Sequence, residues 1–466
     1  MPKNILLLIA DDLGREQIGC YGSRMQATPN LDELARSGTR FDMAFTSTAS
    51  CSGSRTVIYT GLHTHQNGSY GLTHGRNGFQ TLPDVETGPA AFNRLGYKTG
   101  IVGKVHVGPD SAYPWQVRYE SDTRNVADIV RVACAFMKDA AEDKKPFFLT
   151  IGFVDPHRHV PSRAGFGNVE GNYDPQLRDR IFIPDEVEVP PFLSDIPEVR
   201  AELAEYMRAV YRMDQGVGRV LQGLRDNGLE SSTLVLFLSD NGPPFVNSKT
   251  TLFDAGVRLP FILRAPGVGA AGVENPNLVS YVDILPTLLD WGGHGNLQPP
   301  AGMVRRRGRS VLPILNRTEP EPGSGWDHVL GSHTFHEVTN YWPTRFMRDR
   351  RYKYHRNPPP ATIGRRKLAD YIRRAPEELY DLEEDADELV NLAADPAHRH
   401  ILLAMRSTVE AWQEETGDPW LWRDGVSVTR YIASNYAREG LVVPDCFDFD
   451  LDNESSTTYN LLREAR

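Results

Sequence analysis

The sequence predicts an α/β protein with two domains: a large domain in which helices flank a mainly parallel sheet, and a smaller α+β domain at the C-terminus. Three observations support this fold class. Short apolar runs that do not alternate with polar residues are typical of buried parallel strands. Helical patterns lie between these runs, and strands that alternate with helices indicate an α/β fold. This alternation ends after about Tyr341, so we place the domains at residues 1–342 and 343–466.

Each predicted element has its own local signal. The strands are apolar runs bounded by polar residues or glycine, at Ile5–Ala10, Thr99–Val102, Phe147–Val154, Leu234–Leu238 and Pro260–Leu263. The helices have apolar residues on one face, at Thr28–Gly38, Asn125–Asp139 and Pro197–Asn227. The first helix also has Pro29 at its first position and Gly38 as a stop signal. Near the C-terminus we expect a strand-like stretch at Arg345–His355 and a helix that carries Leu402 and Trp412.

Composition excludes several classes of protein. The chain has 466 residues, 40% hydrophobic and 24% charged, which is ordinary for a globular protein. Its net charge of −10 argues against a nucleic-acid binder. The run Ile5–Ala10 is shorter than the roughly 20 residues that a membrane span needs. Asp11 and Asp12 follow it directly, which is not typical of a signal peptide. The four cysteines have no CxxC spacing. We therefore expect a cytoplasmic protein that does not contact a membrane.

Chemically active side chains follow four of the predicted strands. In an open α/β sheet, ligands bind beyond the carboxyl ends of the strands. The fold should therefore gather these side chains in one crevice. They are Asp11 and Asp12, Lys104 and His106, Asp155 and His157, and Asp240 and Asn241.

Part of this set predicts a metal site. Asp11, Asp12, Asp240 and Asn241 offer only oxygen atoms, which suit hard divalent cations such as Ca²⁺ or Mg²⁺. Three carboxylates also bring more negative charge than a crevice tolerates without a cation. The remaining groups, Lys104, His106 and His157, would then hold an anion and move protons.

Cys51 stands in a setting that does not suit a buried structural thiol. It opens the segment Cys51-Ser-Gly-Ser-Arg55, whose small polar residues precede a helix-like run at Arg55–Tyr59. A helix N-terminus favours anions, and an arginine one turn in adds a forked donor. Cys51 should therefore lie where an oxyanion binds.

Together these residues resemble the sulfatase family, within the alkaline phosphatase superfamily. The hallmark Cys-x-Pro/Ser-x-Arg followed by Thr-Gly is similar to Cys51–Arg55 with Thr60-Gly61. Further motifs match in the right order, at Asp11-Asp12, Gly103–His106, Asp155–His157, Ser239–Gly242, Glu378–Leu382 and Asn391-Leu392. Other segments resemble the sulfamidases (heparan N-sulfatases) within the family, at Thr60–Gly71, Gly103–Pro109, Arg212–Gly218, His336–Thr339 and Trp412–Trp420.

The resemblance implies a metal-dependent hydrolase that cleaves a sulfamate or a sulfate ester and releases inorganic sulfate. Cys51 would be oxidised to formylglycine by a formylglycine-generating enzyme. The hydrate of this aldehyde would attack sulfur, and the sulfated enzyme would then expel sulfate. The ion, Ca²⁺ or alternatively Mg²⁺, would be held by Asp11, Asp12, Asp240, Asn241 and the modified Cys51.

The resemblance also assigns roles to individual residues. Arg55 and Lys104 would stabilise the hydrate and the developing charge, and Lys249 would bind sulfate. His106 would take a proton when the intermediate collapses, and His157 would be the acid on the leaving group. Candidates for recognising the sugar or the leaving amine are Asp155, His336, Glu337 and Asp418. The expected substrate is a small sulfated amino sugar, and a homodimer is one option for the assembly.

Two other functions stay open. The same metal, arginine and lysine groups could hold phosphoryl oxygens, as in a phosphomonoester or phosphonate hydrolase. Gly53 stands where the family has proline or serine. If this departure leaves Cys51 unmodified, the chain would be a non-catalytic protein that binds a sulfated glycan.

Overall fold

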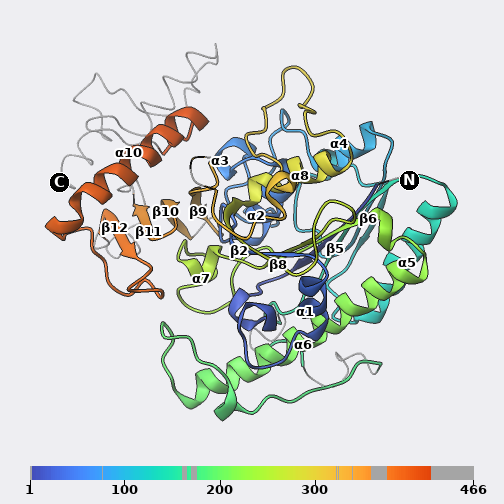
Figure 1. The fold of residues 1–466 in the computed structure, drawn as a ribbon, viewed down its shortest axis with the longest axis horizontal. Helices are drawn as coiled ribbons and strands as arrows, with labels where there is room; N and C mark the ends of the chain where they lie inside the picture. Colours follow the sequence, from blue (N-terminus) through green and yellow to red (C-terminus); the bar gives the residue numbers. More distant parts are fainter. Residues whose placement is uncertain are drawn as a thin grey trace.

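A computed structural model describes residues 3–75, 77–159, 165–168, 176–321, 323, 325–337, 340–357 and 375–420. Its main body is a sheet of eight strands with helices on both faces (Figure 1). In chain order these strands are β1 (Asn4–Ala10), β2 (Thr39–Phe45), β3 (Lys98–Gly103), β4 (Val117–Glu120), β5 (Phe147–Gly152), β6 (Thr233–Ser239), β7 (Phe261–Arg264) and β8 (Val273–Ser280). Their spatial order is β4-β3-β5-β1-β6-β7-β2-β8.

The sheet confirms the predicted fold class, with one correction to a strand. Parallel pairing joins β4, β3, β5, β1 and β6, and β2 is parallel to β8. The run predicted as a parallel strand at Pro260–Leu263 is β7, which is antiparallel to both β6 and β2. An apolar run indicates that both faces of a strand are buried, but it does not indicate whether the strand is parallel or antiparallel to its neighbours.

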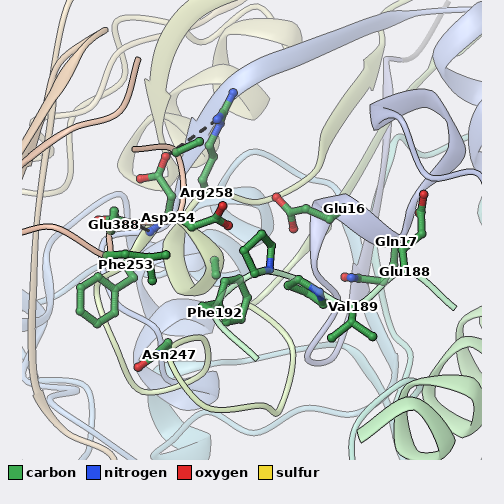
Figure 2. Close-up of a pocket in the computed structure, with 16 residues that line it drawn as sticks. Glu16, Gln17, Glu188, Val189, Phe192, Asn247, Phe253, Asp254, Arg258 and Glu388 are labelled. Atoms are coloured by element: carbon green, nitrogen blue, oxygen red, sulfur yellow. Dashed lines mark hydrogen bonds and ion pairs between the residues drawn. The ribbon is translucent and has the colours of Figure 1, made fainter. Parts of the chain in front are cut away.

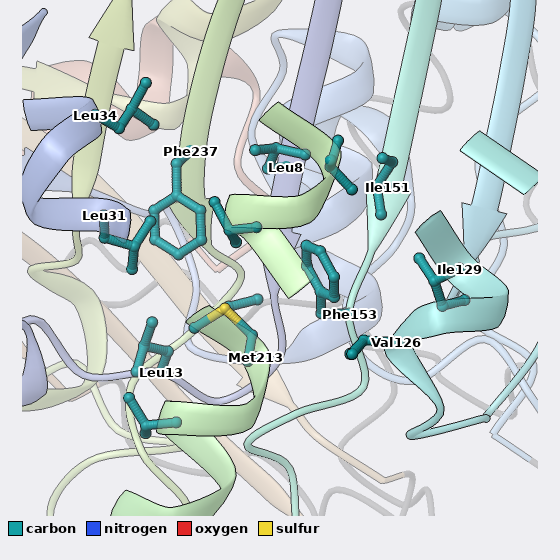
Figure 3. Packing of buried hydrophobic residues seen from close by; sticks show 14 of the residues in the cluster. Leu8, Leu13, Leu31, Leu34, Val126, Ile129, Ile151, Phe153, Met213 and Phe237 are labelled. Atoms are coloured by element: carbon teal, nitrogen blue, oxygen red, sulfur yellow. The ribbon is translucent and has the colours of Figure 1, made fainter. Parts of the chain in front are cut away.

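Alternation along β1 divides the core into two layers. Leu6, Leu8 and Ala10 belong to the layer that contains α1 (Pro29–Arg36), α5 (Val126–Glu142) and α6 (Pro197–Asp226). Figure 3 shows Leu8 in this layer with Leu31, Ile129 and Met213 of the three helices. Ile5, Leu7 and Ile9 face the opposite layer, which includes α2 (Cys51–Thr60), α4 (Gly88–Arg94) and α8 (Ile284–Trp291). Both faces of β1 are therefore buried, which explains why its sequence is apolar without interruption.

A second, antiparallel sheet lies beside the large one (Figure 1). It contains β9 (Val329–Phe335), β10 (Tyr341–Arg348), β11 (Tyr352–Arg356) and β12 (Glu377–Asp381), and α10 (Arg399–Thr416) packs on it. The stretch predicted as strand-like at Arg345–His355 belongs to two strands, β10 and β11, joined by a turn. The predicted boundary between residues 342 and 343 falls within β10, and the division into two domains stays a prediction.

Two short helices complete the described elements near the site. They are α3 (Thr64–Asn67), which follows α2, and α7 (Asp254–Val257), which lies between β6 and β7. No helix of the described ranges is both long enough and apolar enough to cross a membrane.

Candidate active site

The carboxyl ends of neighbouring strands bring the predicted side chains together. Strands β3, β5, β1 and β6 are adjacent in the sheet. Asp11 and Asp12 follow β1, Lys104 follows β3, and Asp240 follows β6. The backbone N–H of Asp12 donates to Oδ1 of Asp240 over 3.2 Å, so the ends of β1 and β6 are joined directly.

Each of the three carboxylates has a cationic partner. Nε of Arg55 lies 2.8 Å from Oδ2 of Asp240, and Nζ of Lys249 lies 2.8 Å from the carboxylate of Asp12. Lys104 pairs with Asp11. The three carboxylates are fully buried. Burial alone would raise the pKa of Asp11, but Lys104 and the other nearby cations outweigh it and hold this pKa well below its usual range.

Cys51 is the first residue of α2, next to these pairs. Its side chain is buried, and Sγ lies 4.0 Å from Oδ1 of Asp12. Burial raises the pKa of the thiol to about 12, although Lys249 and Lys104 act in the opposite direction. An unmodified Cys51 is therefore a neutral thiol near pH 7, and a neutral thiol is a poor nucleophile.

Gly53 has a packing reason to be glycine. A Cβ atom at this position would lie 3.0 Å from Cγ2 of Thr48 and 3.1 Å from the backbone oxygen of Ser69. A side chain here would require Thr48 and Ser69 to shift by a few tenths of an ångström. The departure from the family motif at Gly53 therefore accompanies a close approach of α2 to these two residues.

The donor atoms fit a hard divalent cation. Oδ1 of Asp11 and Oδ1 of Asn241 are buried and have no hydrogen-bond partner within the described ranges. Ligand atoms of Asp11, Asp12, Cys51 and His157 all lie within 4.8 Å of one another. Unpaired oxygens beside clustered carboxylates are the groups that Ca²⁺ or Mg²⁺ would satisfy. Sequence reasoning did not place His157 among the candidate ligands.

Two histidines lie at the edge of this cluster. Nε2 of His157 is 3.8 Å from Oδ2 of Asp12, and burial lowers the pKa of the His157 imidazole. His106 has a φ of 54°, and its Nε2 lies 2.8 Å from Nδ1 of His74. Sequence reasoning did not identify His74, because this residue follows α3 and no strand leads to it.

The residues predicted to contact substrate fall into two groups. Nδ1 of His336 lies 3.0 Å from Oγ of Ser50, the residue before Cys51, and Glu337 is exposed beside it. Asp155 instead pairs with Arg124 and Arg212, and Asp418 pairs with Arg345 at 2.5 Å. Both of these carboxylates are buried. In this structure Asp155 and Asp418 hold arginines, and their contact with substrate stays a prediction.

A separate cavity of about 420 Å³ lies between the loop after β6 and the loop after β12. Figure 2 shows Glu16, Asp254 and Glu388 on its wall, with Phe192 and Phe253 among its apolar lining. Nζ of the buried Lys353 lies 2.8 Å from Asp254 and 3.2 Å from Glu388. The cavity therefore borders a buried ion-pair cluster, and its lining does not include the residues around Cys51.

Comparisons with known proteins match most of the length of this chain. The family model described as Sulfatase matches residues 3–294, and the model described as N-sulphoglucosamine sulphohydrolase, C-terminal, matches residues 246–415. The chain is 38% identical to human (Homo sapiens) N-sulphoglucosamine sulphohydrolase over 476 residues, which cover 91% of this chain and 93% of that protein.

Two solved structures share the fold at lower identity. One, named BT4656, was solved with its substrate D-glucosamine-2-N,6-O-disulfate (TM-score 0.68, 18% identity, covering 90% of this chain and 99% of that one). The other is the phosphonate monoester hydrolase of Agrobacterium radiobacter (TM-score 0.68, 21% identity, covering 89% and 96%). Proteins that differ in their named chemistry thus share this fold, so the fold alone does not select the substrate.

Proposed function

The chain belongs to the sulfatase family, and from this premise we propose that it hydrolyses N-sulfated amino sugars and releases inorganic sulfate. The observation that carries the proposal is the position of Cys51 at the start of α2, beside Asp12 and among three cation–carboxylate pairs. The name of the human relative supports an N-sulfated amino sugar as the substrate.

The cationic side chains would bind the sulfuryl group. A divalent cation held by Asp11, Asp12, Asp240 and Asn241 would supply Lewis acidity toward the sulfuryl oxygens. With the carboxylates engaged by that cation, Lys104 and Lys249 would be free to pair with an oxyanion. Arg55 is fully buried against Asp240 and would keep α2 in register with the end of β6.

Cys51 would serve as the precursor of the nucleophile. Cys51 lies at the start of α2 in a chain of the sulfatase family, and we propose that a formylglycine-generating enzyme converts its thiol to an aldehyde. The hydrated aldehyde would supply a hydroxyl nucleophile where the thiol now lies. This modifying enzyme is the protein partner that the proposal requires.

The two histidines would move the protons. A sulfamate nitrogen must be protonated before it leaves, and His157 would donate this proton. Its Nε2 lies near Asp12, and its Nδ1 lies 2.6 Å from the backbone oxygen of Arg158, which orients the ring. His106 would accept a proton from the nucleophile side of the site.

Two measurements test the proposal. Peptide mass spectrometry across Cys51, on protein from the native host, should find an aldehyde in place of the thiol. Sulfate release should then be compared for N-sulfoglucosamine and 4-nitrophenyl sulfate, with 4-nitrophenyl phosphate as the phosphoryl arm. We expect turnover of N-sulfoglucosamine, and we expect the Cys51→Ala variant to lose it.

Other outcomes would select the competing functions. Faster turnover of the phosphate ester than of both sulfuryl substrates would favour the phosphoryl hydrolase. An intact thiol, with binding of sulfated sugars but no turnover, would favour the glycan-binding protein. Full activity in Cys51→Ala would exclude Cys51 as the source of the nucleophile.

A further inference from the structure

The segment that follows α3, described at residues 70–75 and 77–82, is hydrogen-bonded to three other parts of the chain near the site. The backbone N–H of Thr73 donates to Oγ of Ser52 in α2 over 3.2 Å. The N–H of Leu72 donates to the backbone oxygen of His336, and the N–H of Thr81 donates to that of Gly108, both over 2.8 Å. The backbone around His74 is therefore anchored on both sides, although the His74 side chain is exposed.

His74 contacts His106 directly. Nδ1 of His74 lies 2.8 Å from Nε2 of His106, and the two ring centroids are 4.9 Å apart. The other ring nitrogen of His106, Nδ1, is buried and has no hydrogen-bond partner among the residues that the structure describes. A half-buried imidazole is thus linked to an exposed one through a single hydrogen bond.

The neighbours of His106 favour one of its two tautomers. The charged and titratable groups that face His106 are Lys104, Asp11, Arg55 and His74, and burial with Lys104 lowers its pKa well below the usual range. His106 is therefore a neutral imidazole, with one N–H and one lone pair. One of the two nitrogens joined by the His74–His106 hydrogen bond must carry the proton. With that proton on Nε2 of His106, the buried Nδ1 keeps a lone pair and needs no acceptor among the described residues.

We propose that His74 is a positioning residue for His106. His74 fixes the Nε2–H tautomer of His106 and passes to water the proton that His106 accepts. This inference rests on the proposed function. A hydroxyl O–H bond in the site would break as Nδ1 of His106 gains the proton. The Nε2–H proton of His106 would move to Nδ1 of His74, and the Nε2–H proton of His74 would pass to water. Each ring gains one proton and loses one, so no other reactant is needed.

Burst kinetics provide the first test. With 4-nitrophenyl sulfate, loss of nitrophenol precedes the step in which His106 would accept a proton. In His74→Ala we expect kcat to fall by about tenfold or more, less than the 10²–10⁴-fold effect typical of removing a general base itself. We also expect a burst of about one nitrophenol per aldehyde, because the second half-reaction has become slower. Added imidazole should restore kcat.

Matched variants separate the transfer of the proton through His74 from the positioning of the His106 ring. His74→Asn keeps a hydrogen-bond acceptor near Nε2 of His106 but cannot carry a proton, so it should keep the tautomer and still show the burst. His400→Ala removes an exposed histidine on α10, and this variant should have the same kinetics as the parent enzyme. Activities are normalised to the measured aldehyde content of each protein.

A spectroscopic test does not depend on turnover. In protein labelled with ¹⁵N-histidine, the signal of His106, assigned with His106→Gln, should report the Nε2–H tautomer and lose that preference in His74→Ala. An unchanged tautomer in His74→Ala, or wild-type kcat, would overturn the inference. So would a slower His74→Ala enzyme without burst or imidazole rescue. If the parent protein releases no sulfate, the proposed function fails, while the tautomer still reports on this contact.

Discussion

At the residue scale, each of the three buried aspartates of the site has its own cationic partner. Arg55, Lys104 and Lys249 come from different segments of the chain, yet each one meets a different aspartate. These pairs compensate the negative charge that the sequence alone left unbalanced on the three aspartates. The pairing also leaves Oδ1 of Asp11 and Oδ1 of Asn241 without partners in the described part of the chain. The site is therefore charge-balanced but incomplete in its hydrogen bonds.

Divalent ions should stabilise the folded protein through this cluster. We expect Ca²⁺ to raise the melting temperature and a chelator to lower it, because the ligands come together only in the folded chain. At a concentration 100 times the Kd, the gain would be about 2.7 kcal/mol. Differential scanning calorimetry with and without Ca²⁺ checks this, and the same titration with Mg²⁺ compares the two ions.

Two variants make the ion prediction specific. Asp12→Asn should lose the Ca²⁺-dependent shift in melting temperature. Asp143→Asn changes an exposed carboxylate that pairs with Lys98, and it should keep the full shift. A shift of equal size in both variants would place the ion elsewhere on the protein.

At the element scale, α10 is joined to the segment around α3 by two buried histidines. The rings of His63 and His65 are stacked 5.7 Å apart, and both meet the ring of Trp412 edge-on. Nε2 of His65 also lies 2.8 Å from Oγ1 of Thr416. This contact attaches the helix of the small sheet to a segment that leads out of α2.

Acid should weaken this contact. Burial lowers the pKa of His63 to about 3 and that of His65 to about 4. The charged groups that face the two rings are Asp418, Arg307 and Arg345. Both folded pKa values lie below the unfolded value of about 6.5, so this contribution to stability is present above pH 6.5 and is lost as the pH falls toward 4.

Urea unfolding at pH 7 and at pH 4.5 measures the effect. The free energy of unfolding should fall between pH 7 and pH 4.5, and in His65→Gln we expect this fall to be smaller by an amount on the order of 2 kcal/mol. His400→Ala, at an exposed position of α10, should leave the loss unchanged. If His65→Gln has the same pH dependence as the parent, the histidine pair does not cause the acid sensitivity.

At the scale of the whole molecule, a buried ion-pair cluster joins the small sheet to α7, the helix between β6 and β7. Lys353 in β11 pairs with Asp254 in α7 and with Glu388 after β12. Lys353 is fully buried. Burial raises the pKa of Glu388 to about 7, whereas Lys353 and two arginines outweigh burial and hold the pKa of Asp254 below its usual range. The lysine therefore compensates carboxylates from two separate segments.

Removing this cation should destabilise the folded chain. Lys353→Met leaves Asp254 and Glu388 buried without it, and such a loss typically costs about 3–5 kcal/mol. The triple variant with Asp254→Asn and Glu388→Gln should recover part of that loss. The control is Lys138→Met, which removes an exposed pair with Glu142 and should change the free energy of unfolding by less than about 1 kcal/mol. Equal effects of Lys353→Met and Lys138→Met in urea unfolding would contradict the prediction.

Local patterns predicted the central strands and the side chains that follow them. The runs at β1, β3, β5 and β6 are apolar because both faces of these strands are buried. The mixed patterns of β2, β4 and β8 were not identified as strands. Exposed positions in β4 and an exposed position in β8 interrupt the apolar runs, and pairing with neighbours that are distant in sequence stabilises them as strands.

The sequence by itself determined the α/β class, the polar residues at the strand ends and the cysteine at a helix start, because these depend on periodicity and on the order of residues along the chain. Only the tertiary structure decided which groups meet. It directed Asp155 to Arg212, 57 residues away, and Asp418 to Arg345, 73 residues away. It also brought His74 to His106 and set the antiparallel direction of β7. Contacts between distant segments depend on how strands and loops pack, and no local pattern of residues records that packing.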